Sequence, residues 1–111
     1  MKRSFTQKEI YDYLKDNPLG TEVHIGDLED MQGKDYIFLD FLNDEPILRD
    51  NDAYYQTALQ ISVTVKNFED RKILVNYIKK KFLSAPTYSK SDEFEYYVAQ
   101  FTIYVLLYER Y

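Results

Sequence analysis

The alternation of apolar and polar residues is most regular in the segment Ala58–Lys66, where leucine, isoleucine and two valines occupy every second position. Because successive side chains of a β-strand point to opposite faces of a sheet, this pattern predicts a strand with one buried face. The nearly continuous apolar run Tyr36–Leu42 predicts a second strand, and the segment Glu95–Tyr108 predicts a third strand of unusual length. A short strand is expected at Thr21–Gly26.

Two other segments carry apolar residues at helical spacing behind a helix-start signal. In Thr6–Asp16, Thr6 stands at the N-cap position and Glu9 completes a capping box. In Glu69–Leu83 the apolar residues form one stripe, and Asn67 stands at the N-cap position. These patterns predict two helices, each with one face available for burial.

The order of these elements predicts one domain, residues 1–111, with an α+β fold: a mainly antiparallel sheet of three to four strands with two helices packed on it. The polar segment Thr87–Glu93 is expected to be a turn. Both faces of the last strand are apolar towards its C-terminal end, so either the first helix covers its second face or another subunit does. The expected core contains Ile10, Leu14, Leu39, Ile61, Val63, Leu74, Ile78, Phe101 and Ile103.

The segment Asn43–Thr57 connects two of the expected strands and is longer than a hairpin turn requires. It contains an apolar pair, Ile47 and Leu48, and a tyrosine pair, Tyr54 and Tyr55, which a solvated loop does not need. We therefore interpret residues 43–57 as an extended arm that packs against another subunit. The 12 tyrosines exceed what a core of this size needs, so many of them either mediate protein contacts or occupy outer strand faces.

The composition excludes several kinds of chemistry. The chain has no cysteine and one histidine, which rules out disulfides, thiolate nucleophiles and most zinc sites. His24 is expected to be an ordinary outward-facing strand residue, and Asp40 has no partner base or second carboxylate at a diagnostic spacing. No phosphate-binding loop, nucleophile elbow or zinc motif occurs. We therefore expect no catalytic residue, no metal, no cofactor and no enzymatic activity.

The net charge of −5 is unevenly distributed along the chain. The segment Glu22–Asp52 contains ten acidic and two basic residues, whereas Lys66–Lys81 contains six basic and two acidic residues. An acidic chain does not favour nucleic-acid binding, and opposite charges on separate segments suit head-to-tail contacts between copies. No apolar run approaches the roughly 20 residues of a membrane span, and the N-terminus lacks the apolar core of a signal peptide. A soluble, cytoplasmic domain is therefore expected.

An N-terminal helix and an aromatic-rich strand are followed by the stretches EPILRDNDAYYQTA, LQISVTVKNFEDRKILVNYIKKKF and YYVAQFTIYVLLYE. In element order and texture, the chain from Tyr36 to Tyr108 resembles the small tail terminator and tail completion proteins of long-tailed bacteriophages and prophages. The resemblance implies a virion structural protein that forms a ring, usually sixfold, caps the tail tube and joins it to the head connector. It implies no catalytic residue and no cofactor.

The partners implied by the resemblance are further copies of the chain, the tail tube protein and the head-connector or stopper protein. DNA would only pass through the lumen, no membrane would be involved, and the location would be the tail or neck of a virion assembled in the host cytoplasm. Two alternatives remain open: another neck component, such as a head-completion or stopper protein, and a small acidic adaptor or inhibitor that binds one host protein. The residues expected at subunit or partner interfaces are Ile47, Leu48, Arg49, Tyr54, Tyr55, Tyr96 and Tyr104. The acidic residues expected to face the ring channel are Asp27, Glu29, Asp30, Asp44 and Glu45.

Overall fold

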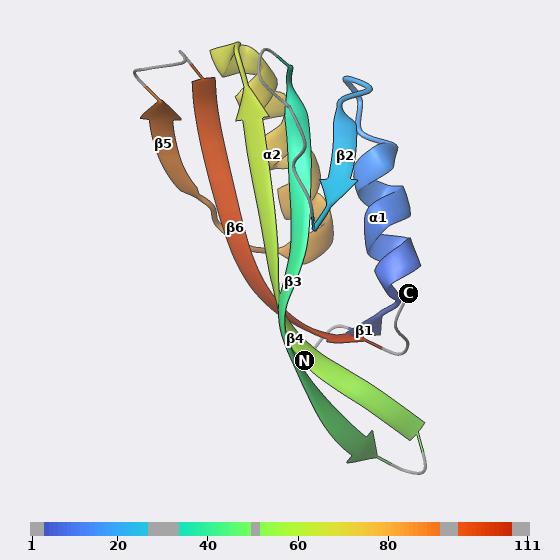
Figure 1. Cartoon of the computed structure of the whole chain (residues 1–111). Helices are drawn as coiled ribbons and strands as arrows, with labels where there is room; N and C mark the ends of the chain where they lie inside the picture. Colours follow the sequence, from blue (N-terminus) through green and yellow to red (C-terminus); the bar gives the residue numbers. More distant parts are fainter. Residues whose placement is uncertain (1–3, 27–33, 50–51, 92–95, 108–111) are drawn as a thin grey trace.

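The computed structural model describes residues 4–26, 34–49, 52–91 and 96–107 of the chain, with only the backbone described at residues 4, 42–49, 52–56, 91 and 106–107. Its elements follow the order β1, α1, β2, β3, β4, α2, β5, β6 (Figure 1). The strands are β1 (Ser4–Phe5), β2 (Glu22–Ile25), β3 (Tyr36–Arg49), β4 (Asp52–Val65), β5 (Thr87–Ser91) and β6 (Tyr96–Leu107). The helices are α1 (Gln7–Lys15) and α2 (Phe68–Phe82).

The described strands form one mixed sheet of six strands with the order β1-β6-β4-β3-β2, and β5 also pairs with β6. The pairs β3–β4, β4–β6 and β5–β6 are antiparallel, whereas β1–β6 and β2–β3 are parallel. The predicted α+β class is confirmed, but the expected three to four strands are too few. The turn expected at the start of Thr87–Glu93 is also wrong, because Thr87–Ser91 forms β5. Strand β1 is short and β5 is polar, so neither has an alternating apolar pattern of its own. Both form because their backbones pair with β6.

Both helices begin at the predicted caps. The Thr6 side-chain oxygen accepts a hydrogen bond from the Glu9 backbone N–H at 3.0 Å, and the Asn67 side-chain oxygen accepts one from the Glu69 N–H at 2.8 Å. Each bond satisfies a backbone donor that has no partner within the helix. Helix α2 ends at Leu83, whose φ of 51° places it in the left-handed conformation that commonly terminates helices.

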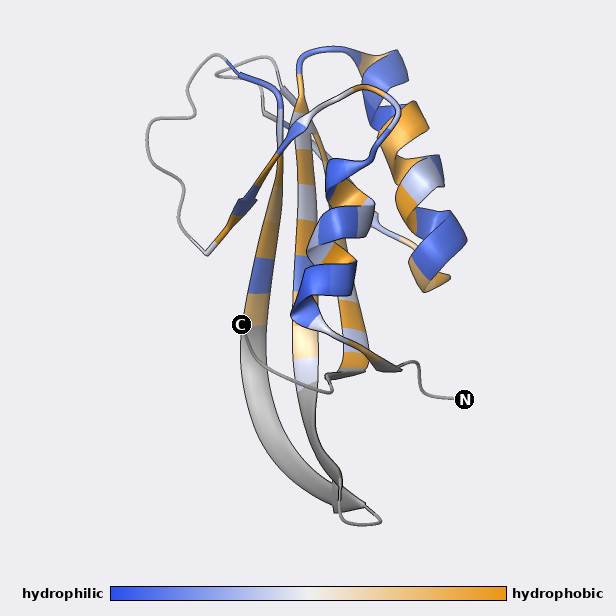
Figure 2. Cartoon of the chain, turned by 90° about the vertical axis from the view of Figure 1, so that its right-hand side faces the viewer, coloured by the Kyte–Doolittle hydropathy of each residue, from blue (hydrophilic) through white to orange (hydrophobic). Residues whose placement is uncertain are grey.

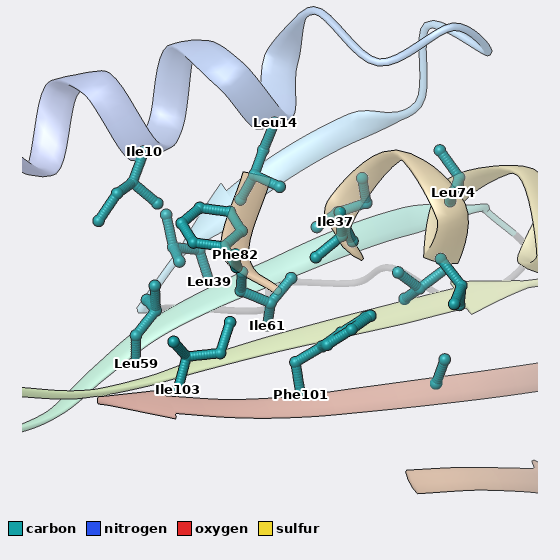
Figure 3. Close-up of a cluster of buried hydrophobic side chains, with 14 of the residues drawn as sticks. Ile10, Leu14, Ile37, Leu39, Leu59, Ile61, Leu74, Phe82, Phe101 and Ile103 are labelled. Atoms are coloured by element: carbon teal, nitrogen blue, oxygen red, sulfur yellow. The ribbon is translucent and has the colours of Figure 1, made fainter. Parts of the chain in front are cut away.

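The core lies between the helices and one face of the sheet. Both helices pack on the same side of the sheet, as Figure 2 shows from the edge. The side chains of Ile10 and Leu14 from α1 and those of Leu74 and Phe82 from α2 point towards the strand residues in Figure 3. The idea that the first helix covers the second face of the last strand is therefore wrong. The predicted core is confirmed, because all of its members are buried: Ile10, Leu14, Leu39, Ile61, Val63, Leu74, Ile78, Phe101 and Ile103.

The segment interpreted as an arm is a ribbon of two paired strands. Strands β3 and β4 stay in antiparallel register as far as the pair Arg49 and Asp52, with a register shift between Phe41 and Asp44. In Figure 1 this part of the two strands extends away from the sheet region that the helices cover. Antiparallel pairing satisfies the backbone groups within the ribbon, so the ribbon can project without a helix packed on it.

A buried asparagine joins the end of α1 to β2. The Asn17 side-chain nitrogen donates to the carbonyl oxygens of Leu14 and Thr21, both at 2.9 Å. Its side-chain oxygen accepts from the backbone N–H groups of Leu19 at 3.1 Å and Thr21 at 3.0 Å. With both side-chain atoms hydrogen-bonded, Asn17 can be buried at low cost and fixes the turn that leads into the edge strand.

The two helices are joined by a reciprocal tyrosine pair. The Tyr13 hydroxyl donates to the Tyr77 carbonyl oxygen and the Tyr77 hydroxyl donates to the Tyr13 carbonyl oxygen, each at 2.6 Å. The two rings stack with centroids 4.4 Å apart and an interplanar angle of 10°. Burial raises the pKa of Tyr13, and burial followed by the charges of Tyr13 and Asp16 raises the pKa of Tyr77. Both hydroxyls must be protonated to donate these bonds.

We expect the fold to lose stability as the pH rises above about 10, where an unperturbed tyrosine ionises. Because the pKa values of Tyr13 and Tyr77 are raised in the folded state, the unfolded chain releases these two protons first. The stability that the two protonated hydroxyls contribute is complete when the pH lies below the pKa of tyrosine in the unfolded chain. It is lost as the pH rises through the pKa values of the folded state. Urea unfolding at a series of alkaline pH values should show a shallower loss for the Tyr13→Phe/Tyr77→Phe variant than for the wild type.

Tyr104→Phe provides the control for this experiment, because it changes an exposed tyrosine outside the pair. This variant should retain the wild-type dependence of the free energy of unfolding on pH. Identical alkaline slopes for the wild type and the double variant would show that the pair does not contribute.

Candidate interaction surfaces

The face of the sheet opposite the helices, here called the open face, is formed by alternate residues of β3, β4 and β6. Cross-strand register places Phe38, Ser62 and Gln100 side by side on this face, and Ala58 next to Tyr104. Within the described part of the chain, no helix or strand packs over these residues, since both helices lie on the other side (Figure 2). The Tyr104 side chain is 69% exposed as a consequence.

The open face combines aromatic rings with neutral polar groups. Its aromatic residues are Tyr36 and Phe38 on β3 and Tyr96 and Tyr104 on β6, and its one charged residue among the described side chains of β3, β4 and β6 is Asp40. Tyrosine presents both an apolar ring and a hydroxyl, which suits protein interfaces. The same side chains supply no cation to neutralise phosphate, so their chemistry fits a protein partner better than a nucleic acid.

The predicted interface residues divide into two groups. Tyr96 and Tyr104 lie near opposite ends of β6, both on the open face, with Tyr96 half-buried and Tyr104 exposed. The other predicted interface residues fall in the ribbon, where the backbone alone is described: Ile47, Leu48, Arg49, Tyr54 and Tyr55. The open face and the ribbon are continuous, because both belong to β3 and β4.

The predicted channel-facing acids are not gathered into a described site. Asp27, Glu29 and Asp30 lie outside the described residues. Asp44 and Glu45 belong to β3, where they pair with Thr57 and Gln56 through the backbone. Their role in lining a channel stays a prediction.

Each lateral edge of the sheet carries a hollow between its edge strand and the neighbouring helix. At the β5 edge a hollow of about 290 Å³ is lined by Phe68, Arg71, Lys72, Val75, Asn76 and Tyr88. At the β2 edge a hollow of about 400 Å³ is lined by Tyr11, Lys15, Gly20, Thr21, Glu22, Val23 and His24. The sequence pattern did not indicate the first of these hollows, because β5 has the composition of a turn.

Arg71 joins the first turn of α2 to β5 and β6. One of its terminal nitrogens donates to the carbonyl oxygens of Ser89 at 3.1 Å and Val98 at 3.2 Å. The guanidinium carbon also lies 5.2 Å from the ring centre of Phe68, 4.8 Å from that of Tyr88 and 5.3 Å from that of Tyr97. Through these contacts Arg71 holds the polar strand β5 against the helix layer.

Among residues 4–26, 34–49, 52–91 and 96–107, no three histidine, aspartate or glutamate side chains come together in a way that could hold a metal ion. At the exposed β2 edge, the His24 Nε2 atom lies 3.3 Å from the Glu22 Oε2 atom. Neither of the described helices is long and apolar enough to cross a membrane. The candidate sites described above are surfaces: the open face, the ribbon and the two sheet edges.

Comparison with known proteins adds no family assignment. No protein-family model matches the chain, and no curated protein sequence gives a match.

Proposed function

We propose that this protein is a structural subunit that assembles with copies of itself into a ring at the end of a bacteriophage tail tube, as a tail terminator or tail completion protein. The observation that best supports this proposal is the open face, which leaves Tyr104 69% exposed opposite the helix-covered side. An exposed aromatic surface of this kind favours association. The order of the elements and the pattern of apolar and polar residues resemble those of the terminator proteins, and this resemblance is why we propose a tail-tube ring as the assembly.

The proposed mechanism is steric and interfacial. One surface of the ring reproduces the contact that a further tube subunit would make, and the opposite surface offers no place for another tube ring. Many modest contacts, repeated around a closed symmetric ring, stabilise such an assembly without a catalytic group. The ribbon formed by β3 and β4 reaches a neighbouring subunit or a tail component. The acidic segment Glu22–Asp52 repels DNA phosphates in the lumen, so DNA passes without adhering.

The partners in this proposal are further copies of the chain, the tail tube protein and the head-connector or stopper protein. A knockout of the gene in its phage is expected to give filled heads without attached tails, together with tails of abnormal length. Complementation with the wild-type gene should restore complete particles. Normal, infectious virions from the knockout would remove this function, and an adaptor that binds one host protein would then be the leading alternative.

Tyr104→Asp tests the open face in the purified protein. Placing a carboxylate on an aromatic contact surface should shift the mass measured by light scattering from an oligomer towards the monomer, because burial of the unpaired charge is costly. Leu83→Asp is the matched control, since Leu83 is 74% exposed at the end of α2 and its left-handed backbone tolerates aspartate. An oligomer that survives Tyr104→Asp unchanged would exclude the open face from assembly.

A further inference from the structure

We propose that neighbouring copies of this chain join edge to edge, with β5 of one copy pairing with β2 of the next, so that the sheet continues from subunit to subunit. This inference rests on the self-assembly proposed above and adds a contact between sheet edges to those proposed for the open face and the ribbon. The occupant of each sheet edge is a second copy of the same chain.

Both edge strands have a free side. In the described residues β5 pairs with β6 alone and β2 pairs with β3 alone, so each presents one row of backbone groups without a strand partner. Such edges readily accept another strand. The two edges lie at opposite sides of the sheet in Figure 1. Joining them is a head-to-tail contact, which closes into a ring when the rotation between copies allows it.

The directions of the two strands fit this contact. Strand β2 runs parallel to β3, β3 runs antiparallel to β4, β4 runs antiparallel to β6, and β6 runs antiparallel to β5. Strands β2 and β5 therefore run in opposite directions. When two copies meet with their helices on the same side, β5 and the next copy's β2 form an antiparallel ladder.

The alternation of side chains selects the register. Tyr88 and Ile25 lie on the helix side, since they pair with buried Ala99 and Leu39, whereas Ser89 and His24 lie on the open face. Placing Ile25 opposite Tyr88 pairs every residue of β2 with a residue of β5. A shift by two residues in one direction would instead place Ile25 opposite Pro86, which has no backbone N–H to donate.

The side chains at the two edges complement each other in this register. Ile25 is 44% exposed, and Tyr88 and Phe68 on the other edge are 52% and 47% exposed. The contact brings Ile25 to the hollow of about 290 Å³ that Phe68 and Tyr88 line. Burying these three apolar surfaces together removes them from water.

The helix layer and the charges are compatible with the same contact. Helix α1 lies beside β2 and α2 lies on the β5 side of the sheet, so the next copy's α1 continues the helix layer over β5 (Figure 1). The β5 edge carries Arg71, Lys72 and Lys90, whereas the β2 edge carries Lys15 and Glu22. The positively charged β5 edge thus meets the β2 edge, where the charges of Lys15 and Glu22 cancel. The contact therefore depends on backbone pairing and apolar burial.

Engineered cysteines test the contact directly, because the natural chain has none. The variants His24→Cys and Ser89→Cys are purified separately, mixed and oxidised, and the disulfide-linked species are identified by mass spectrometry. Directly opposite residues of an antiparallel ladder lie about 4.5–5.5 Å apart between Cα atoms, which matches disulfide geometry. The mixture should yield a dimer that links position 24 to position 89, and neither variant alone should yield a comparable homodimer.

Ser62→Cys is the matched control, since Ser62 lies on the open face of the central strand β4. It should not form a disulfide with His24→Cys, and a link between positions 24 and 62 as abundant as the link between positions 24 and 89 would overturn the proposal. Circular dichroism of each variant establishes that the fold is retained.

The outcomes separate this inference from the proposed function. An oligomer in light scattering and negative-stain images that yields no link between positions 24 and 89 overturns the edge contact and leaves the ring-forming function standing. A protein that stays monomeric at every concentration removes both. A predominance of homodimers linked through position 89 would show a symmetric contact and would also overturn the head-to-tail joint.

Discussion

Replacing Ile61 with alanine is expected to lower the free energy of unfolding by about 2–5 kcal/mol, because truncation of a buried isoleucine loses apolar burial and leaves a cavity. Ile61 has no exposed surface and lies in register between Leu39 on β3 and Phe101 on β6. All three side chains lie beneath the helix layer (Figure 3). Urea unfolding followed by circular dichroism measures the change, with the midpoint falling and the slope staying the same.

Ser62→Ala is the matched control, because it alters the next residue of the same strand on the opposite face. This variant should cost less than about 1 kcal/mol, as most substitutions outside the core do. A loss below about 1 kcal/mol for Ile61→Ala would be incompatible with the cavity cost of a buried isoleucine and with the register described for β4.

Deleting Asp44–Asp52 is expected to abolish assembly while leaving a folded domain. The deletion removes the β3 side of the ribbon and its tip, and joins Asn43 to Ala53. The buried core residues among the described side chains lie outside the deleted segment, so the helix-covered part of the sheet is expected to keep its packing. Light scattering should report a monomer, and circular dichroism should retain the helix and strand signals of the full chain.

A second variant separates the surface of the ribbon from its length. Ile47→Ser/Leu48→Ser keeps every residue of the ribbon and removes its apolar pair, and it should also weaken assembly if that pair makes the contact. Lys79→Ser/Lys80→Ser on the exposed side of α2 is the control and should leave the mass unchanged. Assembly that survives both the deletion and the double substitution would exclude the ribbon from the mechanism.

Local sequence determined the helices, the core and the helix-covered parts of the long strands, but not the extension of β3 and β4 through the ribbon. Thr6 and Asn67 mark the helix starts through short-range hydrogen bonds, which depend on residues two or three positions away. The alternation around Ile61 assigns a buried face because the side-chain period of a strand is two. The sequence pattern also identified buried residues in each of α1, α2, β3, β4 and β6, because each of those elements carries its own apolar face. In α2 it did not single out Val75, which is 2% exposed.

The tertiary structure decided everything that depends on partners far apart in the chain. The residues of β5 carry no strand pattern of their own. The strand forms because β6 supplies its backbone partners and Arg71 donates a hydrogen bond to the Ser89 carbonyl oxygen. The placement of both helices on one face, secured by Tyr13 and Tyr77, leaves the open face without a helix. The period of two in a strand's sequence indicates that the strand has two different faces. Only long-range packing and backbone pairing decide which face a helix covers and which sheet edges remain open.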